Sequence, residues 1–172
     1  MSHRILAVLD TYPALSETFL YTTLENLVDA GFDVSIRARR KGKSPHHPKL
    51  ADVKYLPSEE LPLFIKLAWV GGYALRLLVT SPNVLLKTIQ YLGKLPGKFR
   101  QRCMIAFRIL PLLCEQAEIT YLSFGGLAVK YLEYIELNSK TIFSLRGSDI
   151  NIQPLLSKVY TGRLKAAIHS AR

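Results

Sequence analysis

The segment Ser144-Leu-Arg-Gly-Ser-Asp-Ile-Asn151 holds the side chains of this sequence that are best suited to chemistry. An arginine, a glycine and an aspartate follow directly on a short apolar run, and core packing does not explain that combination. Arg146 can clamp a phosphate or carboxylate, and Asp149 can accept hydrogen bonds from sugar hydroxyls or orient Arg146. Arg146 and Asp149 are therefore candidate catalytic residues and Ser148 a candidate substrate-binding residue, with a plain surface turn as the alternative.

A second candidate site lies after the first apolar run, where a helix is predicted to begin. Ser16, Glu17 and Thr18 stand at that start, and helix N-termini bind phosphate through their free N–H groups and the helix dipole. The alternative, at even odds, is that Ser16 only caps the helix and Glu17 complements its dipole.

A third candidate site is the glycine pair of Ser123-Phe-Gly-Gly126, again at the end of an apolar run. Gly125 and Gly126 would let a ligand approach the backbone closely, and Ser123 would contribute a hydroxyl. A tight turn that needs glycine for purely conformational reasons explains the same pair equally well.

These segments need a framework that brings strand ends together. Strands are predicted at Arg4–Asp10 and Phe32–Ala38, around an amphipathic helix at Glu17–Ala30, which makes a βαβ unit with a right-handed crossover. Further strands are predicted at 52–56, 118–124 and 141–145, with helices at 61–114, 127–137 and 154–166. The result is an α/β fold, a Rossmann-like doubly wound parallel sheet with helices inserted in its middle. In such sheets ligands bind at the carboxyl ends of the strands.

The helical stretch 61–114 is predicted to break at Ser81-Pro82, with Ser81 as N-cap, and again between Gly93 and Gly97. At the other end of the chain, Ala167-Ile-His-Ser170 has the composition of a strand that begins and stops. A chain that stops within an element is expected to be part of a larger protein.

Several kinds of site have no counterpart in the sequence. No G-x-G-x-x-G is present, so no dinucleotide cofactor is expected. His46-His47 is an adjacent pair and His3 and His169 are isolated, so no metal site is expected either. Two cysteines in 172 residues are too few for a disulfide framework, and no uninterrupted apolar run reaches the roughly 18 residues of a membrane span.

The net charge of +10 is confined to parts of the chain. Two windows without any acidic residue, 34–51 and 61–114, hold 14 of the 23 basic residues. The second window adds Trp69, Tyr73 and Tyr91 to its basic and apolar residues, a composition that suits the surface of an anionic membrane. The alternative is that these helices cover the sheet with their Lys and Arg at the rim. Nucleic acid is a poorer partner, because no recognisable nucleic-acid-binding module is present.

Four segments, in order, resemble those of a known enzyme family. Tyr12-Pro-Ala-Leu-Ser-Glu-Thr-Phe19, Gly31-Phe-Asp-Val-Ser-Ile-Arg37, Ile119…Phe124-Gly125 and Phe143-Ser-Leu-Arg-Gly-Ser-Asp-Ile150 are similar to landmarks of retaining family-four (GT-B) glycosyltransferases of exopolysaccharide and colanic acid biosynthesis. The resemblance implies two Rossmann-like domains, of which residues 1–172 would be the N-terminal, acceptor-side domain. The C-terminal domain, which holds the nucleotide-sugar donor in that family, has no counterpart here.

The resemblance also implies an activity: transfer of a sugar, with retained configuration, from a nucleotide-sugar to a lipid-linked or polysaccharide acceptor at the cytoplasmic face of a membrane. The nucleotide-sugar would be a co-substrate, no metal or other cofactor would be needed, and this chain would be inactive without a donor-binding half. Tyr121 and Ser123 replace two family histidines, and Arg146 stands where many members carry a histidine before Gly147. By the same resemblance, Tyr121 is a further substrate-binding candidate. The alternative is a non-catalytic, membrane-associated binding module derived from such an enzyme.

Overall fold

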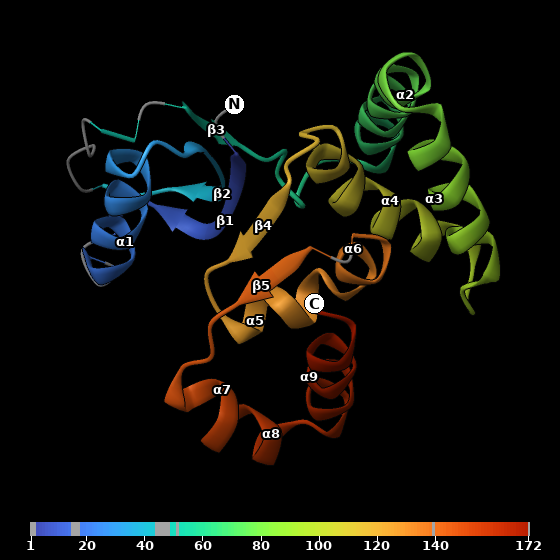
Figure 1. Ribbon diagram of the computed structural model, residues 1–172. Helices are drawn as coiled ribbons and strands as arrows, with labels where there is room; N and C mark the ends of the chain where they lie inside the picture. Colours follow the sequence, from blue (N-terminus) through green and yellow to red (C-terminus); the bar gives the residue numbers. More distant parts are fainter. Residues whose placement is uncertain (1–2, 15–17, 44–48, 51, 139, 172) are drawn as a thin grey trace. The chain divides into compact units, whose positions relative to one another are not determined.

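The structure is a computed structural model that describes residues 3–14, 18–43, 49–50, 52–138 and 140–171. The chain divides into two compact units, Met1–Pro57 with Ala117–Arg172 (unit 1) and Ser58–Gln116 (unit 2). Unit 1 contains the sheet and unit 2 is helical (Figure 1).

Unit 1 is built on a parallel sheet of five strands: β1 (Arg4–Tyr12), β2 (Asp33–Lys41), β3 (Asp52–Tyr55), β4 (Ile119–Leu122) and β5 (Thr141–Phe143). Their order is β3-β2-β1-β4-β5, and every neighbouring pair is parallel. Apolar residues make β1 a central strand, since Ile5 to Leu9 are all buried. The predicted α/β, Rossmann-like doubly wound sheet is therefore confirmed.

Helix α1 (Thr18–Asp29) covers β1 and β2 on one face of the sheet. It buries Leu20, Tyr21 and Leu24 against the strands, and Leu27 and Val28 pack against the same core as partly buried residues. Gly31 follows α1 with φ +88°, a left-handed conformation that an L side chain rarely adopts. This glycine ends the helix and lets the chain turn into β2.

The other helices of unit 1 are α5 (Gly125–Lys130), α6 (Leu132–Leu137), α7 (Gly147–Asn151), α8 (Gln153–Leu156) and α9 (Lys158–Ser170). Helix α9 packs on α5 and α6. Its Arg163 donates from Nη1 and Nη2 to the two carboxylate oxygens of Glu133 at 2.9 and 3.0 Å, and from Nε to the carbonyl of Val129 at 2.9 Å. These bonds fix α9 to α5, which contains Val129, and to α6, which contains Glu133.

The strand predicted at Ala167–Ser170 is wrong, because these residues are the last turn of α9. Ser157 begins that helix by accepting a hydrogen bond at its Oγ from Tyr160 N, 3.2 Å away. Leu164 and Ala167 are both buried, and their separation by three residues places them on one side of the helix. Packing of that side therefore continues the helix through residues whose composition suggested a strand.

Unit 2 consists of α2 (Leu63–Thr80), α3 (Pro82–Lys94) and α4 (Phe99–Leu113), so the predicted breaks in the helical stretch are confirmed. Pro82 is the first residue of α3, as predicted, but the Ser81 side chain does not cap that helix. Its Oγ instead accepts a hydrogen bond from Gln116 Nε2 at 2.6 Å. Cys103 lies in α4 and Cys114 directly after it, both as free thiols.

Candidate functional site

The predicted site residues that the structure describes lie at the carboxyl edge of the sheet. β1 and β4 are neighbours in the sheet. The connection after β1 leads to β2 on one side, and the connection after β4 leads to β5 on the other side. The carboxyl ends of β1 and β4 therefore form the topological switch point of the fold. Thr18 is the first residue of α1, the helix that follows β1, and is exposed, whereas Ser16 and Glu17 lie outside the described residues. Gly125 opens α5 after β4, and Arg146 follows β5.

An arginine and two phenylalanines meet at this edge. The guanidinium carbon of Arg146 lies 3.0 Å from the ring centroid of Phe124, a cation–π contact between the β5–α7 and β4–α5 connections. Phe19, in the first turn of α1, is 56% exposed, and its ring centroid lies 6.4 Å from that of Phe124. Sequence reasoning had singled out Arg146 but neither phenylalanine, although both belong to the segments that carry the resemblance.

Asp149 lies at the centre of a buried hydrogen-bond cluster. Its Oδ2 accepts from the backbone N–H of Arg146 at 2.9 Å and of Gly125 at 3.1 Å, and its Oδ1 accepts from Tyr160 Oη at 3.0 Å. Burial, followed by the hydrogen bond to the Asp149 carboxylate, raises the pKa of Tyr160 to about 12. The Asp149 side chain thus joins the β4–α5 and β5–α7 connections to α9, and the bond that it makes to Arg146 is to the backbone N–H.

The two adjacent glycines differ in their surroundings. A Cβ on Gly125 would lie 2.8 Å from Leu145 Cδ2 and 2.9 Å from Asp149 Cγ, closer than real Cβ atoms come to their neighbours. A Cβ on Gly126 would have no atom within 4 Å, and this residue is exposed. Gly125 is therefore required by packing, while Gly126 leaves open backbone beside the Phe124–Arg146 contact.

A chain of hydroxyl groups ties the end of β4 to the end of β5. Ser144 Oγ donates to the carbonyl oxygen of Ser123. The Tyr121 hydroxyl, 3.1 Å from Ser144 Oγ, therefore donates its hydrogen to Ser144 Oγ. Ser123 itself is wholly buried, and the described residues offer its Oγ no hydrogen-bond partner. Ser148, on α7, is exposed. Of the predicted hydroxyl-bearing residues that are described, Thr18 and Ser148 are thus the ones open to a ligand.

The chain is fixed by side-chain contacts where it leaves β1, at Tyr12 and Ala14. Tyr21 Oη accepts from the backbone N–H of Ala14 at 2.6 Å, and the Tyr21 ring packs edge-on against Tyr12, with centroids 5.3 Å apart. Asp10, near the end of β1, forms an ion pair with Arg39 of β2. The aspartate thereby offsets part of the positive charge that the first basic window brings to this edge.

Two hollows of the described surface lie away from this edge. One, of about 470 Å³, is at the amino ends of the strands, where His3 Nδ1 and Glu118 Oε2 are 2.6 Å apart and Lys140 lines the wall. The hydrogen bond to His3 lowers the pKa of Glu118. The other, of about 430 Å³, lies along α2 in unit 2.

No metal-binding cluster of three His, Cys, Asp or Glu side chains is found in the part of the chain that the structure describes. One helix among the described residues, α2, is long and apolar enough to cross a membrane by length and composition, although Lys66 and Arg76 interrupt it. The sequence predicts no such segment only when uninterrupted apolar runs are considered, because Lys66 and Arg76 divide this one. No family model matches the chain, and no curated protein or solved structure is significantly similar to it.

The edge therefore offers a stacked guanidinium, an exposed aromatic ring, open backbone and a few hydroxyl groups. Such a set can bind an anionic, hydroxyl-rich ligand, with the guanidinium on a phosphate or carboxylate. Asp149 has both carboxylate oxygens engaged by the protein, which makes it a positioning residue in this arrangement.

Proposed function

We propose that the carboxyl edge of β1, β4 and β5 is an acceptor-binding site, and that this chain is the acceptor-side half of a retaining glycosyltransferase. The observation that carries the proposal is the Arg146–Phe124 contact beside the exposed Phe19 at the switch point of the sheet. The resemblance of the segments around these three residues to family-four glycosyltransferases supplies the reaction class.

The acceptor would be a lipid-linked or polysaccharide glycan. A phenyl ring gives the apolar face of a sugar a flat surface to pack on, and a guanidinium donates to phosphate oxygens in its own plane. The protein's part in the reaction would be to hold the acceptor hydroxyl in line with the donor and to stabilise developing charge. A donor-binding half would supply the nucleotide-sugar.

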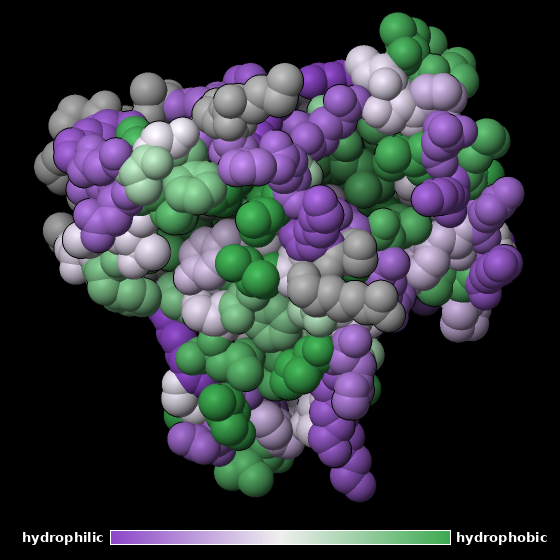
Figure 2. Space-filling view, in the orientation of Figure 1, coloured by the Kyte–Doolittle hydropathy of each residue, from purple (hydrophilic) through white to green (hydrophobic). Residues whose placement is uncertain are grey.

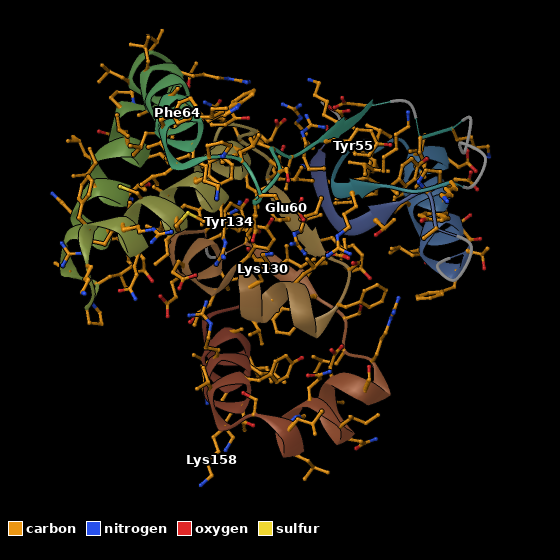
Figure 3. All side chains as sticks on the ribbon, turned by 180° about the vertical axis from the view of Figure 1, so that it is seen from behind. Tyr55, Glu60, Phe64, Lys130, Tyr134 and Lys158 are labelled. Carbon is orange, nitrogen blue, oxygen red and sulfur yellow. The ribbon has the colours of Figure 1, made fainter. Side chains whose placement is uncertain are left out.

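Binding can be tested on the chain as it stands with glucose 1-phosphate as the probe, by isothermal titration calorimetry. Methyl glucoside and inorganic phosphate are the two halves of that probe, and each should bind more weakly than the whole. Arg146→Gln should weaken binding of the probe at least about tenfold, because a charge-assisted bidentate hydrogen bond is lost. Lys158→Gln, a change at an exposed residue of α9 (Figure 3), is the matched control and should leave binding unchanged. Equal affinities of the two variants would refute the role of Arg146.

Transfer is tested separately, with uridine diphosphate glucose as donor. The chain alone is expected to transfer no sugar, and with a donor-binding half Arg146→Ala should lower transfer by orders of magnitude. An unchanged rate in that variant would remove Arg146 from the reaction.

A second candidate function is binding without transfer. It is favoured by Asp149, whose carboxylate is buried and committed to two backbone N–H groups and the Tyr160 hydroxyl. Probe binding together with no transfer in the presence of any donor-binding half would select this second function.

A further inference from the structure

We infer that α2 lies in the plane of an anionic lipid bilayer, with one side inserted to the boundary between headgroups and acyl chains. The inference does not rest on the proposed function, since it concerns unit 2 alone. It starts from an unusual exposure: of the 18 residues of α2, almost all apolar, the structure buries only Leu77.

The exposed apolar side chains of α2 form a continuous stripe. At 3.6 residues per turn, Phe64, Leu67, Leu75 and Leu78 lie along one side of the helix, with Gly71 between them. All four large side chains are exposed, Phe64 by 72% and Leu75 by 63%. Figure 3 labels Phe64 near the start of this helix. A stripe of this length is more than the scattered exposed apolar residues that soluble proteins tolerate.

The remaining side of α2 is occupied by the helical unit itself. Leu77 is buried, Cys114 Sγ donates to the carbonyl of Tyr73 at 3.7 Å, and Lys66 Nζ lies 5.9 Å from the ring centroid of Phe107 in α4. Arg76 Nη2 also donates to the carbonyl of Cys114, at 3.5 Å. One side of α2 is therefore packed on protein while the other has no described partner.

This two-sidedness distinguishes a helix that lies on a membrane from one that spans it. A length of 18 residues corresponds to about 27 Å, near the thickness of the hydrocarbon core. A spanning α2 would place its two ends on opposite sides of the bilayer, yet α4 packs on both α2 and α3, and Lys66 and Arg76 would enter hydrocarbon. With α2 in the plane of the bilayer, all three helices remain on the same side of the membrane and only the apolar stripe contacts lipid.

The flank of the stripe has the residues that favour the headgroup region. Trp69 and Tyr73 stack with centroids 5.6 Å apart, and with Arg76 they line a groove of about 430 Å³. Ile65, Ala68 and Gly72 also line this groove. Tryptophan and tyrosine concentrate at membrane–water interfaces, and a guanidinium beside them can pair with a lipid phosphate. The groove therefore fits the glycerol and phosphate level of a lipid.

The charge of unit 2 selects anionic lipid. Its eight basic residues all lie between Leu61 and Cys114, where no acidic residue occurs. In α3, at 3.6 residues per turn, exposed Lys87 and Lys94 lie together on one side of the helix, and exposed Leu86 and Ile89 lie together on an adjoining side. Figure 2 shows hydrophobic side chains at the position of α2 and hydrophilic ones along α3. Basic residues next to an inserted apolar stripe favour membranes that contain anionic headgroups. A nucleic acid would bind the basic side chains only and would leave the apolar stripe of α2 exposed to water.

Trp69 makes the test direct, because it is the one tryptophan of the chain. The full chain is titrated with vesicles of phosphatidylglycerol and phosphatidylcholine in equal parts, and with vesicles of phosphatidylcholine alone. Binding to the anionic vesicles should shift the Trp69 emission to the blue, and the affinity should be at least about tenfold lower for neutral vesicles or at high salt. No shift, or binding that is indifferent to lipid charge and salt, overturns the inference.

Depth is measured with lipids brominated at different positions of the acyl chain. Trp69 should be quenched most by bromine close to the headgroup. A spanning α2 would place Trp69, six residues after Leu63, roughly 9 Å along the helix and within the hydrocarbon core, so strongest quenching by deep bromine overturns the in-plane arrangement.

Paired variants separate the stripe from general hydrophobicity and charge. Leu75→Ser with Leu78→Ser should lower vesicle binding about tenfold or more, whereas Leu155→Ser, at an 86% exposed leucine of unit 1, should not change it. Lys87→Gln with Lys94→Gln should lower binding to anionic vesicles only, with Lys158→Gln as control. Far-UV circular dichroism confirms that each variant is folded. Equal losses for a variant pair and its control overturn the assignment of this surface.

Discussion

Alanine at each of the two adjacent glycines of α5 should change stability in opposite directions. Gly125→Ala introduces a methyl group into a filled space, and Gly126→Ala adds one where no atom lies within 4 Å. The two variants have the same chemistry and neighbouring positions, so each serves as control for the other.

The size of the effect follows from what the new Cβ would meet. At Gly125 it would lie 2.8 Å from Leu145 Cδ2, a side chain that can move, and 2.9 Å from Asp149 Cγ, which three hydrogen bonds hold in place. Overpacking of this kind costs about 1–3 kcal/mol, and weakening a buried bond to a carboxylate costs about 1.5–3 kcal/mol more. Gly126→Ala should instead stabilise the helix by about 0.5–1 kcal/mol. We expect a gap of at least roughly 3 kcal/mol between the variants.

The assay is urea unfolding of the full chain, followed by far-UV circular dichroism. Emission of Trp69 is recorded in parallel, because this residue reports on unit 2. With a slope of about 1–3 kcal/mol per molar urea, a gap of this size separates the midpoints by at least about 1 M. A Gly125→Ala variant within about 0.5 kcal/mol of the parent chain would show that Asp149 is not held against this backbone, and equal losses in both variants would show that the helix start tolerates no alanine.

Three further predictions concern the same unit. Ser123→Ala should leave the melting temperature unchanged or raise it, because the variant removes a buried Oγ for which the described residues offer no partner; a drop of several degrees would contradict this. Folding raises the pKa of Tyr160 from 10.0 to about 12, so the protonated Tyr160 hydroxyl stabilises the folded state. This stabilisation is complete below pH 10 and is lost between pH 10 and 12. Tyr160→Phe should remove this part of the pH dependence of urea unfolding, and an unaltered dependence would count against the Tyr160–Asp149 bond. Arg163→Gln should cost about 2 kcal/mol in the same assay by leaving the buried Glu133 without its two donors, and the double variant Arg163→Met with Glu133→Leu should recover most of that loss; no recovery would argue against a pairwise interaction.

The sheet could be predicted because each of its determinants is local. An apolar run specifies β1, and alternating apolar and polar residues specify β2. The spacing of Leu20 and Leu24 specifies the buried side of α1, and Gly31 marks the turn from α1 into β2. The candidate site could be predicted only as three separate segments. Topology brings them to one edge, but which side chains touch depends on the third dimension.

The errors arose where tertiary contacts decide local structure. Residues 167–170 have strand-like composition, yet they are helical because α9 packs on α5 and α6 and buries Ala167. Ser81 precedes Pro82 in a typical N-cap position, but its Oγ accepts a hydrogen bond from Gln116, which lies far along the chain. Nothing in the sequence pairs Phe19 with Phe124, or Tyr160 with Asp149, because these partners belong to different elements.

The position of unit 2 in the chain has a consequence for how this protein can change. It is the connection from β3 to β4, which must pass β2 and β1, three strand spacings or roughly 14 Å, and a crossover of about a dozen residues would suffice. The sheet thus sets no upper limit on what fills this connection and no requirement on its surface. Selection can lengthen, shorten or exchange α2, α3 and α4 without disturbing the strand order, so the proposed lipid preference of unit 2 and the proposed ligand of unit 1 can diversify independently.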